Sequence, residues 1–247
     1  MVNKLVIFDL DGTLLNSKNE VTEATKKAIW KCKERGDYIA YITGRGIIKT
    51  KKFIKDLPCD AFACNNGSKI YCKDKLIQSN CIDFHYAKQF LEKECANKNF
   101  FVVMEPYKYL NYEDKKIDNI DYFKADIKSL PKNQIDMISI RNREGIDVEK
   151  YDILQFKKSG ANELMVNSKE ATKLNALKVI AEFFEILKEN IISFGDDFSD
   201  IEVFNNSGIS VAMGNSIPEL KEIASHITDD NNNEGIANYI NKVLYKE

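Results

Sequence analysis

The chain has 247 residues, of which 44% are hydrophobic and 30% are charged, and its formal net charge is -2. These values are typical of a globular protein with an apolar core, and the near-balance of charges does not favour a nucleic-acid partner. No apolar run approaches the roughly 18 residues that cross a bilayer, and the first residues lack a signal-peptide pattern. We therefore expect a cytoplasmic protein with no membrane and no nucleic-acid partner.

Short apolar runs alternate along the chain with helical patterns. Five apolar runs predict buried strands, at 5–8, 38–42, 61–64, 191–194 and 209–213. Apolar residues at helical spacing predict helices over 21–32, 174–184 and 236–244. Strands that alternate with helices favour an α/β fold built on a doubly wound, Rossmann-like parallel sheet.

The middle of the chain has a different pattern, with shorter apolar runs and frequent tyrosine and phenylalanine. We expect residues 82–167 to form a small α+β domain, inserted into a core domain made of residues 1–81 and 168–247. Some aromatic and basic residues of this domain could contact the substrate, pack in the fold or lie on the surface, and the sequence does not distinguish these roles. They are Tyr107, Tyr109, Tyr112, Arg141 and Arg143.

Polar clusters follow four of the predicted strands, at the ends where doubly wound sheets bind ligands. These clusters are Asp9 to Thr13, Thr43 to Arg45, Asn65 to Ser68, and Gly195 to Asp200. If the strands are neighbours, at least four carboxylates converge. Two unit charges about 4 Å apart repel by roughly 4 kcal/mol at an effective dielectric of ~20. A hard divalent cation such as Mg²⁺ would offset this repulsion.

The same clusters contain groups that bind anions. Gly12 and Gly44 allow turns whose backbone N–H groups point at an anion, and Thr13 and Thr43 add hydroxyl donors. Together with magnesium, these groups suit a phosphoryl ligand. An aspartate can attack phosphorus as a nucleophile, and a second carboxyl two residues later can protonate the leaving group.

The order of these motifs resembles the haloacid dehalogenase superfamily, in particular its Cof-type, subfamily IIB branch of sugar-phosphatase-like proteins. The first motif is matched by Asp9-Leu10-Asp11-Gly12-Thr13 and the second by Ile42-Thr43-Gly44-Arg45. Lys173 matches the lysine of the third motif, and Gly195-Asp196 with Asp200 matches the fourth. The resemblance covers nearly the whole chain, although the middle matches only in position and size.

The resemblance implies a phosphoric monoester hydrolase that works through an aspartyl-phosphate. Asp9 would be the nucleophile, and Asp11 would protonate the leaving alcohol and later activate water. Thr43 and the backbone N–H groups of Leu10 and Gly44 would hold the phosphoryl oxygens. Lys173 would neutralise charge on Asp9 and on the transferring group.

The resemblance also implies a Mg²⁺ ion held by Asp9, the Asp11 carbonyl and Asp196, with Asp200 in support. The substrate would be a small phosphorylated metabolite, and no protein partner would be required. About 130 residues separate Thr43 from Lys173, which leaves room there for a cap domain of the C2 type. Ser199 is a departure, because the branch usually has an asparagine there that helps to hold phosphate.

Several other interpretations of these motifs remain open. Asp9 and Asp11 could open a calcium loop, but position six of such a loop requires glycine and is Leu14 here. A phosphomutase of the phosphomannomutase type would share the aspartyl-phosphate chemistry. A non-catalytic sensor of phosphometabolites is suggested by Ser199. Arg45 is interpreted as a structural residue.

Overall fold

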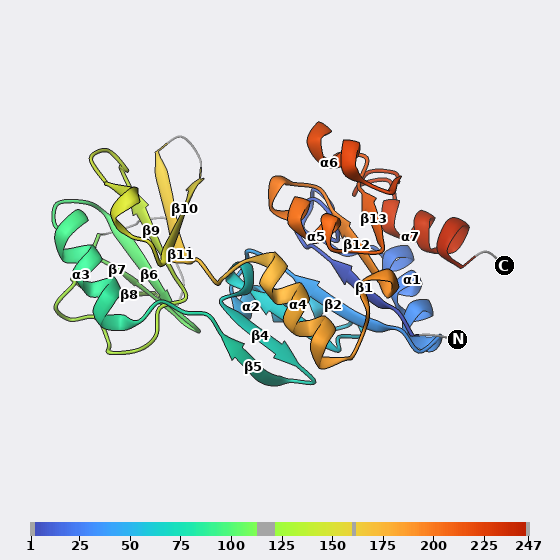
Figure 1. Cartoon of the computed structure of the whole chain (residues 1–247), viewed down its shortest axis with the longest axis horizontal. Helices are drawn as coiled ribbons and strands as arrows, with labels where there is room; N and C mark the ends of the chain where they lie inside the picture. The colour runs from blue at the N-terminus through green and yellow to red at the C-terminus, as the bar shows by residue number, and fades with distance from the viewer. Residues whose placement is uncertain (1–2, 113–121, 160–161, 246–247) are drawn as a thin grey trace.

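The computed structural model describes residues 3–112, 122–159 and 162–245, which form two sheets that lie side by side along the long axis (Figure 1). The larger sheet has eight strands in the order β14-β13-β12-β1-β2-β3-β4-β5. Its strands are β1 (Leu5–Phe8), β2 (Tyr38–Ile42), β3 (Ala61–Cys64), β4 (Lys69–Cys72), β5 (Lys75–Ser79), β12 (Ile191–Gly195), β13 (Ile209–Ala212) and β14 (His226–Ile227).

All five strands that were predicted from apolar runs are present in this sheet, and the six strands from β14 to β3 are parallel. The expected α/β fold is therefore confirmed. The sequence analysis did not predict the antiparallel hairpin of β4 and β5 at one edge. Only alternate residues of β4 are buried, and β5 is mostly exposed, so neither strand forms an apolar run.

Helices cover both faces of the larger sheet (Figure 1). They are α1 (Glu23–Glu34), α2 (Ile47–Ile54), α4 (Lys173–Phe183), α5 (Ile201–Asn205), α6 (Pro218–Ile223) and α7 (Gly235–Tyr239), and a π-helical turn at Ile240–Leu244 continues α7. Successive residues of a strand face opposite sides, and β1 follows this rule. Val6 and Phe8 pack in the cluster that includes α1 and α7, while Leu5 and Ile7 pack against α4.

The smaller sheet has six strands in the order β10-β11-β9-β6-β7-β8 and carries helix α3 (Phe84–Glu94). Its strands are β6 (Phe100–Met104), β7 (Tyr107–Leu110), β8 (Tyr122–Lys124), β9 (Met137–Arg141), β10 (Leu154–Ser159) and β11 (Glu163–Ser168). It has an apolar core of its own, to which Phe90, Phe100 and Ile138 belong. We propose that 82–167 is the inserted cap domain and that 1–81 with 168–247 is the core domain.

The described part of the chain contains no helix long and apolar enough to cross a membrane. All six cysteines are free. Cys59 is exposed and the other five are buried or half-buried.

Asp136 connects the two sheets, although its side chain is completely buried. It accepts hydrogen bonds from Ser68 Oγ at 3.1 Å and Lys69 Nζ at 3.0 Å, and from Glu105 N at 2.9 Å. A buried carboxylate is tolerated only when such partners replace water. Glu105 adds a second connection, because its Oε1 accepts hydrogen bonds from Ile47 N and from the Asn65 side chain, both at 3.0 Å.

Asp136→Ala should lower the free energy of unfolding by about 3 kcal/mol, because it leaves the half-buried Lys69 ammonium and the Glu105 N–H without their acceptor. Urea unfolding followed by circular dichroism measures this loss. The matched control is Asp152→Ala, which removes an exposed carboxylate and should change stability by less than about 0.5 kcal/mol. Equal losses in the two variants would contradict the connecting role of Asp136.

Candidate active site

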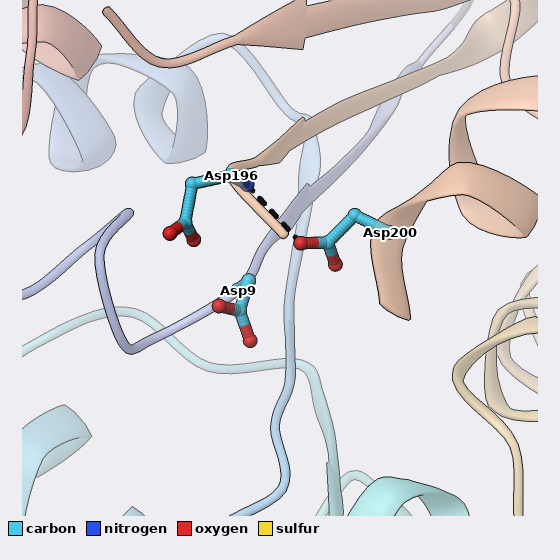
Figure 2. A group of neighbouring side chains, drawn as sticks. All are labelled: Asp9, Asp196 and Asp200. Carbon is cyan, nitrogen blue, oxygen red and sulfur yellow. Dashed lines mark hydrogen bonds between the residues drawn. The ribbon is translucent and has the colours of Figure 1, made fainter. Parts of the chain in front are cut away.

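The predicted polar clusters meet at the carboxyl ends of three adjacent strands. β1 lies between β2 and β12, so Asp9, Thr43 and Asp196 follow neighbouring strands. The side chains of Asp9, Asp196 and Asp200 converge (Figure 2), and one carboxylate oxygen from each lies within 4.8 Å of the others. Sequence positions nearly 200 residues apart therefore share one site.

Lys173 lies at the centre of this cluster. It is the first residue of α4, and the hydroxyl of Thr172 caps this end by accepting from Asn175 N at 3.0 Å. The lysine is only 6% exposed, and its Nζ donates to Asp9 Oδ1 and Asp200 Oδ1, both at 2.8 Å. Burial alone would lower the pKa of Lys173, but the two carboxylates raise it above its usual value. The lysine therefore stays charged at neutral pH.

Asp200 organises the loop that follows β12. Its Oδ2 accepts hydrogen bonds from the backbone N–H groups of Asp196 and Asp197, both at 3.1 Å, and Figure 2 shows the first of these. Its Oδ1 is bound to Lys173. Both oxygens of Asp200 thus have protein partners, so Asp200 holds the loop and the lysine in place beside Asp9.

Asp196 is positioned by the turn that follows β1. Gly12 has a φ of +75°, and a Cβ there would lie 2.1 Å from Asp196 Oδ2, so the position requires glycine on two grounds. The Thr13 hydroxyl donates to Asp196 Oδ1 at 2.8 Å. The sequence analysis assigned that hydroxyl to an anionic ligand, but it orients the Asp196 carboxylate instead.

The cluster contains three carboxylates and one ammonium, so negative charge is in excess. Burial raises the pKa of Asp9 despite the opposing effect of Lys173. Burial also raises the pKa of Asp196, to about 6. Neighbouring carboxylates add to the raised pKa in both cases. A group of carboxylate oxygens with excess negative charge fits a hard divalent cation.

Asp11 lies outside this cluster and forms an ion pair with Arg45. Arg45 Nε donates to Asp11 Oδ2 at 2.7 Å, and Nη2 donates both to Asp11 Oδ1 and, at 2.9 Å, to Asn19 Oδ1. The guanidinium also lies 4.5 Å from the centre of the Phe53 ring. The expectation that four carboxylates converge is therefore wrong, because the fourth has its own cation.

The interpretation of Arg45 as merely structural was also incomplete. The signal was its place in the Thr43-Gly44-Arg45 cluster, which brings a cation to the same strand ends as the acids. The contact joins residues 34 positions apart, and spacing alone gives no indication of it.

The groups expected to bind phosphate lie at the same strand ends. Thr43 is completely buried, and its hydroxyl accepts from Arg45 N at 3.1 Å. A Cβ at Gly44 would lie 3.1 Å from the Asn66 side chain, so glycine permits this close approach. Within the described ranges, no acceptor lies against the backbone N–H of Leu10 or of Gly44. These two N–H groups are thus available to an anionic ligand.

The fold and the site define an α/β enzyme with an aspartate-based centre. A family model for haloacid dehalogenase-like hydrolases matches residues 6–240. Because this match spans nearly all of the chain, the protein belongs to the haloacid dehalogenase-like hydrolases.

Known proteins agree with this assignment along their whole length. The Bacillus subtilis (strain 168) protein YcsE, named a 5-amino-6-(5-phospho-D-ribitylamino)uracil phosphatase, is 27% identical over 240 residues, which cover 96% of this chain and 94% of that protein. TM0651 from Thermotoga maritima has a TM-score of 0.86 at 25% identity and 99% coverage of both chains. BT4131, described as a subclass IIB sugar phosphatase, has a TM-score of 0.76 at 21% identity, covering 96% of this chain and 98% of that one. The expected family is confirmed, and the protein is an enzyme of the phosphatase type.

The raised pKa of Asp196 predicts how the stability of the metal-free protein depends on pH. Burial raises this pKa from 3.8 to about 6, so the folded state binds the proton more tightly than the unfolded state. Stability is therefore lost as the pH rises from about 4 through about 6. The Asp196→Asn side chain cannot ionise, so this variant should not lose stability in the same way. Between about pH 4 and pH 6, its free energy of unfolding should therefore rise by on the order of 2 kcal/mol relative to that of the wild type.

Urea unfolding in EDTA at several pH values between about 4 and 7 measures this difference. Asp152→Asn is the control, because it removes an exposed carboxylate. If the free energies of unfolding of the Asp196→Asn and wild-type proteins change with pH in the same way between about pH 4 and pH 7, Asp196 does not have the raised pKa.

Proposed function

We propose that this protein is a magnesium-dependent phosphatase that hydrolyses small phosphorylated metabolites, such as sugar phosphates or similar monoesters, through an aspartyl-phosphate. The arrangement of Lys173 between Asp9 and Asp200, beside the available N–H groups of Leu10 and Gly44, carries this proposal. It combines an oriented carboxylate with donors for a phosphoryl group. YcsE and BT4131, by their names, also act on phosphorylated small molecules.

In the first half of the proposed reaction, Asp9 attacks phosphorus. Lys173 occupies Asp9 Oδ1, which leaves Oδ2 as the attacking oxygen. The N–H groups of Leu10 and Gly44 and the Thr43 hydroxyl stabilise charge on the phosphoryl oxygens. As the bond from Asp9 to phosphorus forms, the bond to the leaving oxygen breaks, and Asp11, which enters this step in its protonated form, donates its proton to that oxygen.

In the second half, Asp11 accepts a proton from the water that attacks the phosphorylated Asp9. This releases phosphate and restores the Asp9 carboxylate. Lys173 stays between Asp9 and Asp200 throughout and balances the charge of the group in transfer.

A magnesium ion fits this site because the available ligands are oxygens and negative charge is in excess. Asp9, Asp196 and the Asp11 carbonyl would hold it, with Asp200 in support. When bound, the ion would supply positive charge that neutralises the phosphoryl group. Ser199 lies at the edge of the same site, where its short hydroxyl would replace the usual asparagine as a contact to phosphate.

Asp11 and Arg45 together form the acid–base part of the proposed mechanism. The Asp11 side chain is 56% exposed, whereas that of Arg45 is 19% exposed and packs on Phe53. The more buried Arg45 side chain, which is packed on Phe53, therefore orients the more exposed Asp11 carboxylate. We infer that Arg45 positions Asp11 at the mouth of the site, where the leaving oxygen would lie.

Asp9→Asn should reduce turnover by at least about a thousandfold, because an amide cannot attack phosphorus. Phosphate release from a panel of phosphorylated metabolites, with magnesium and with EDTA, measures this loss. Asp197→Asn, which changes an exposed neighbour of the cluster, is the control and should retain most activity. Circular dichroism should show an intact fold in both variants.

The same panel distinguishes the alternatives. Isomerised sugar phosphate without phosphate release would indicate a phosphomutase. Tight binding of a phosphometabolite with background turnover would indicate a sensor. Full activity in Asp9→Asn would overturn the mechanism.

Arg45→Met should lower kcat by about 10- to 100-fold for an alkyl phosphate, whose leaving group needs a proton, and much less for p-nitrophenyl phosphate. If Arg45 acts through Asp11, Arg45→Met should cause no further loss in an Asp11→Asn background. Steady-state kinetics of the two single variants and the double variant measure this coupling. Independent, additive losses would show that Arg45 does not act through Asp11.

A further inference from the structure

A cavity of about 230 Å³ lies between the smaller sheet and the core domain. Lys173 and Ser199 line it on the core side, and Gln155, Lys157 and Asn167 line it on the side of the smaller sheet. Lys173 lines the cavity and is hydrogen-bonded to Asp9, so the cavity adjoins the carboxylate cluster. This cavity therefore offers space beside the cluster for a group attached to a phosphoryl bound at Asp9.

The three residues from the smaller sheet share one face. Gln155 and Lys157 are two residues apart on β10, and Asn167 pairs with Gln155 across the ladder to β11. Strand geometry therefore places all three on the same side. The opposite face carries Leu154 and Val166, which are buried in the apolar core of this sheet. One face thus stabilises the domain, and the other faces the site.

The two amide side chains present acceptors to the cavity. Gln155 Nε2 donates to the carbonyls of Ser168 at 3.0 Å and Ala171 at 2.6 Å, and Asn167 Nδ2 donates to the carbonyl of Asp136 at 3.0 Å. Both N–H donors of the Gln155 amide and one of the two on the Asn167 amide are therefore used. In the described part of the chain no donor reaches either amide oxygen, although Asn167 is only 3% exposed. Neither amide oxygen is among the buried, unpartnered side-chain atoms of the described residues, so both are accessible from the cavity and can accept a hydrogen bond from a ligand there.

The other residues that line the cavity add charged and apolar groups to these two acceptors. Lys157 contributes an ammonium that contacts no carboxylate among the described residues, and Glu202 contributes a carboxylate from the core side. Phe198 is 57% exposed and adds an apolar surface. Apart from Lys173, the cavity therefore carries one positive and one negative charge, together with two carbonyl acceptors.

We propose that Gln155, Lys157 and Asn167 are specificity residues that bind the leaving group, and that they select an uncharged leaving group with several hydroxyls. The proposal rests on the proposed phosphatase function. Hydroxyls can donate to the two amide oxygens and accept from Lys157. A second phosphate would meet Glu202 and two carbonyl oxygens, and an apolar group would leave the Asn167 oxygen unpaired.

The test uses two adjacent lysines of β10 that face opposite ways. Lys157 lines the cavity, whereas Lys158 pairs with Leu164 on the other face. Both lysines are exposed, so neither substitution should affect folding. Lys157→Met should lower kcat/KM for sorbitol 6-phosphate about tenfold or more, because it removes a charged donor. It should change kcat/KM for p-nitrophenyl phosphate, which has no hydroxyls, less than twofold, and Lys158→Met should change neither value.

Each result has a distinct meaning. Equal kcat/KM for sorbitol 6-phosphate in Lys157→Met, Lys158→Met and the wild type would overturn this inference and leave the phosphatase function standing. Equal losses on both esters in Lys157→Met would also overturn it, because that pattern indicates a general effect on the site. No hydrolysis of either ester by the wild type would overturn the proposed function and this inference with it.

Discussion

The arrangement of the site depends on one buried ammonium. Lys173 bonds Asp9 at the end of β1 and Asp200 after β12, and so connects two segments of the chain that are far apart in sequence. Without this cation, Asp9 and Asp200 would face each other in a medium that screens charge poorly. The lysine can be buried because α4 starts at this point, with its first turn capped by Thr172. The helix thus delivers a charge as well as an apolar face.

Around this ammonium, the acids divide into two groups with different environments. Asp9, Asp196 and Asp200 are drawn together by Lys173, Thr13 and the backbone of the loop after β12, and they retain excess negative charge. Asp11, only two residues from Asp9, faces solvent and pairs with Arg45. The turn that follows β1 produces this separation, because the strand ends at Phe8 and the chain has turned by Gly12, whose φ is +75°. Two aspartates in one short motif thereby acquire different environments, which is what the proposed mechanism requires of them.

The smaller sheet contributes through both of its faces. Its apolar face forms an independent core, and its polar face lies over a cavity that is lined by Lys173 on the opposite side. Asp136 and Glu105 fix this arrangement by bonding residues of the larger sheet and of α2. Tyr109 packs against the core of the smaller sheet and stacks on Phe123, and Arg141 lies over the Tyr112 ring. The aromatic and basic residues that the sequence analysis named are therefore not the residues that line the cavity.

The sequence by itself determined five of the six parallel strands and the residues at their ends, but not the two-residue strand β14. Strands buried on both faces appear as continuous apolar runs, and a ligand site in such a sheet follows directly after them. The sequence could not reveal β4 and β5, because these strands lack such apolar runs. It also could not reveal that Asp11 pairs with Arg45, or that Thr13 donates a hydrogen bond to Asp196. These contacts, like the face formed by Gln155, Lys157 and Asn167, join residues whose proximity arises only from the twist of the sheets and the packing of one domain on the other. The local sequence pattern indicates which face of its own strand a side chain lies on. Which residues that side chain then contacts is decided only by the tertiary structure.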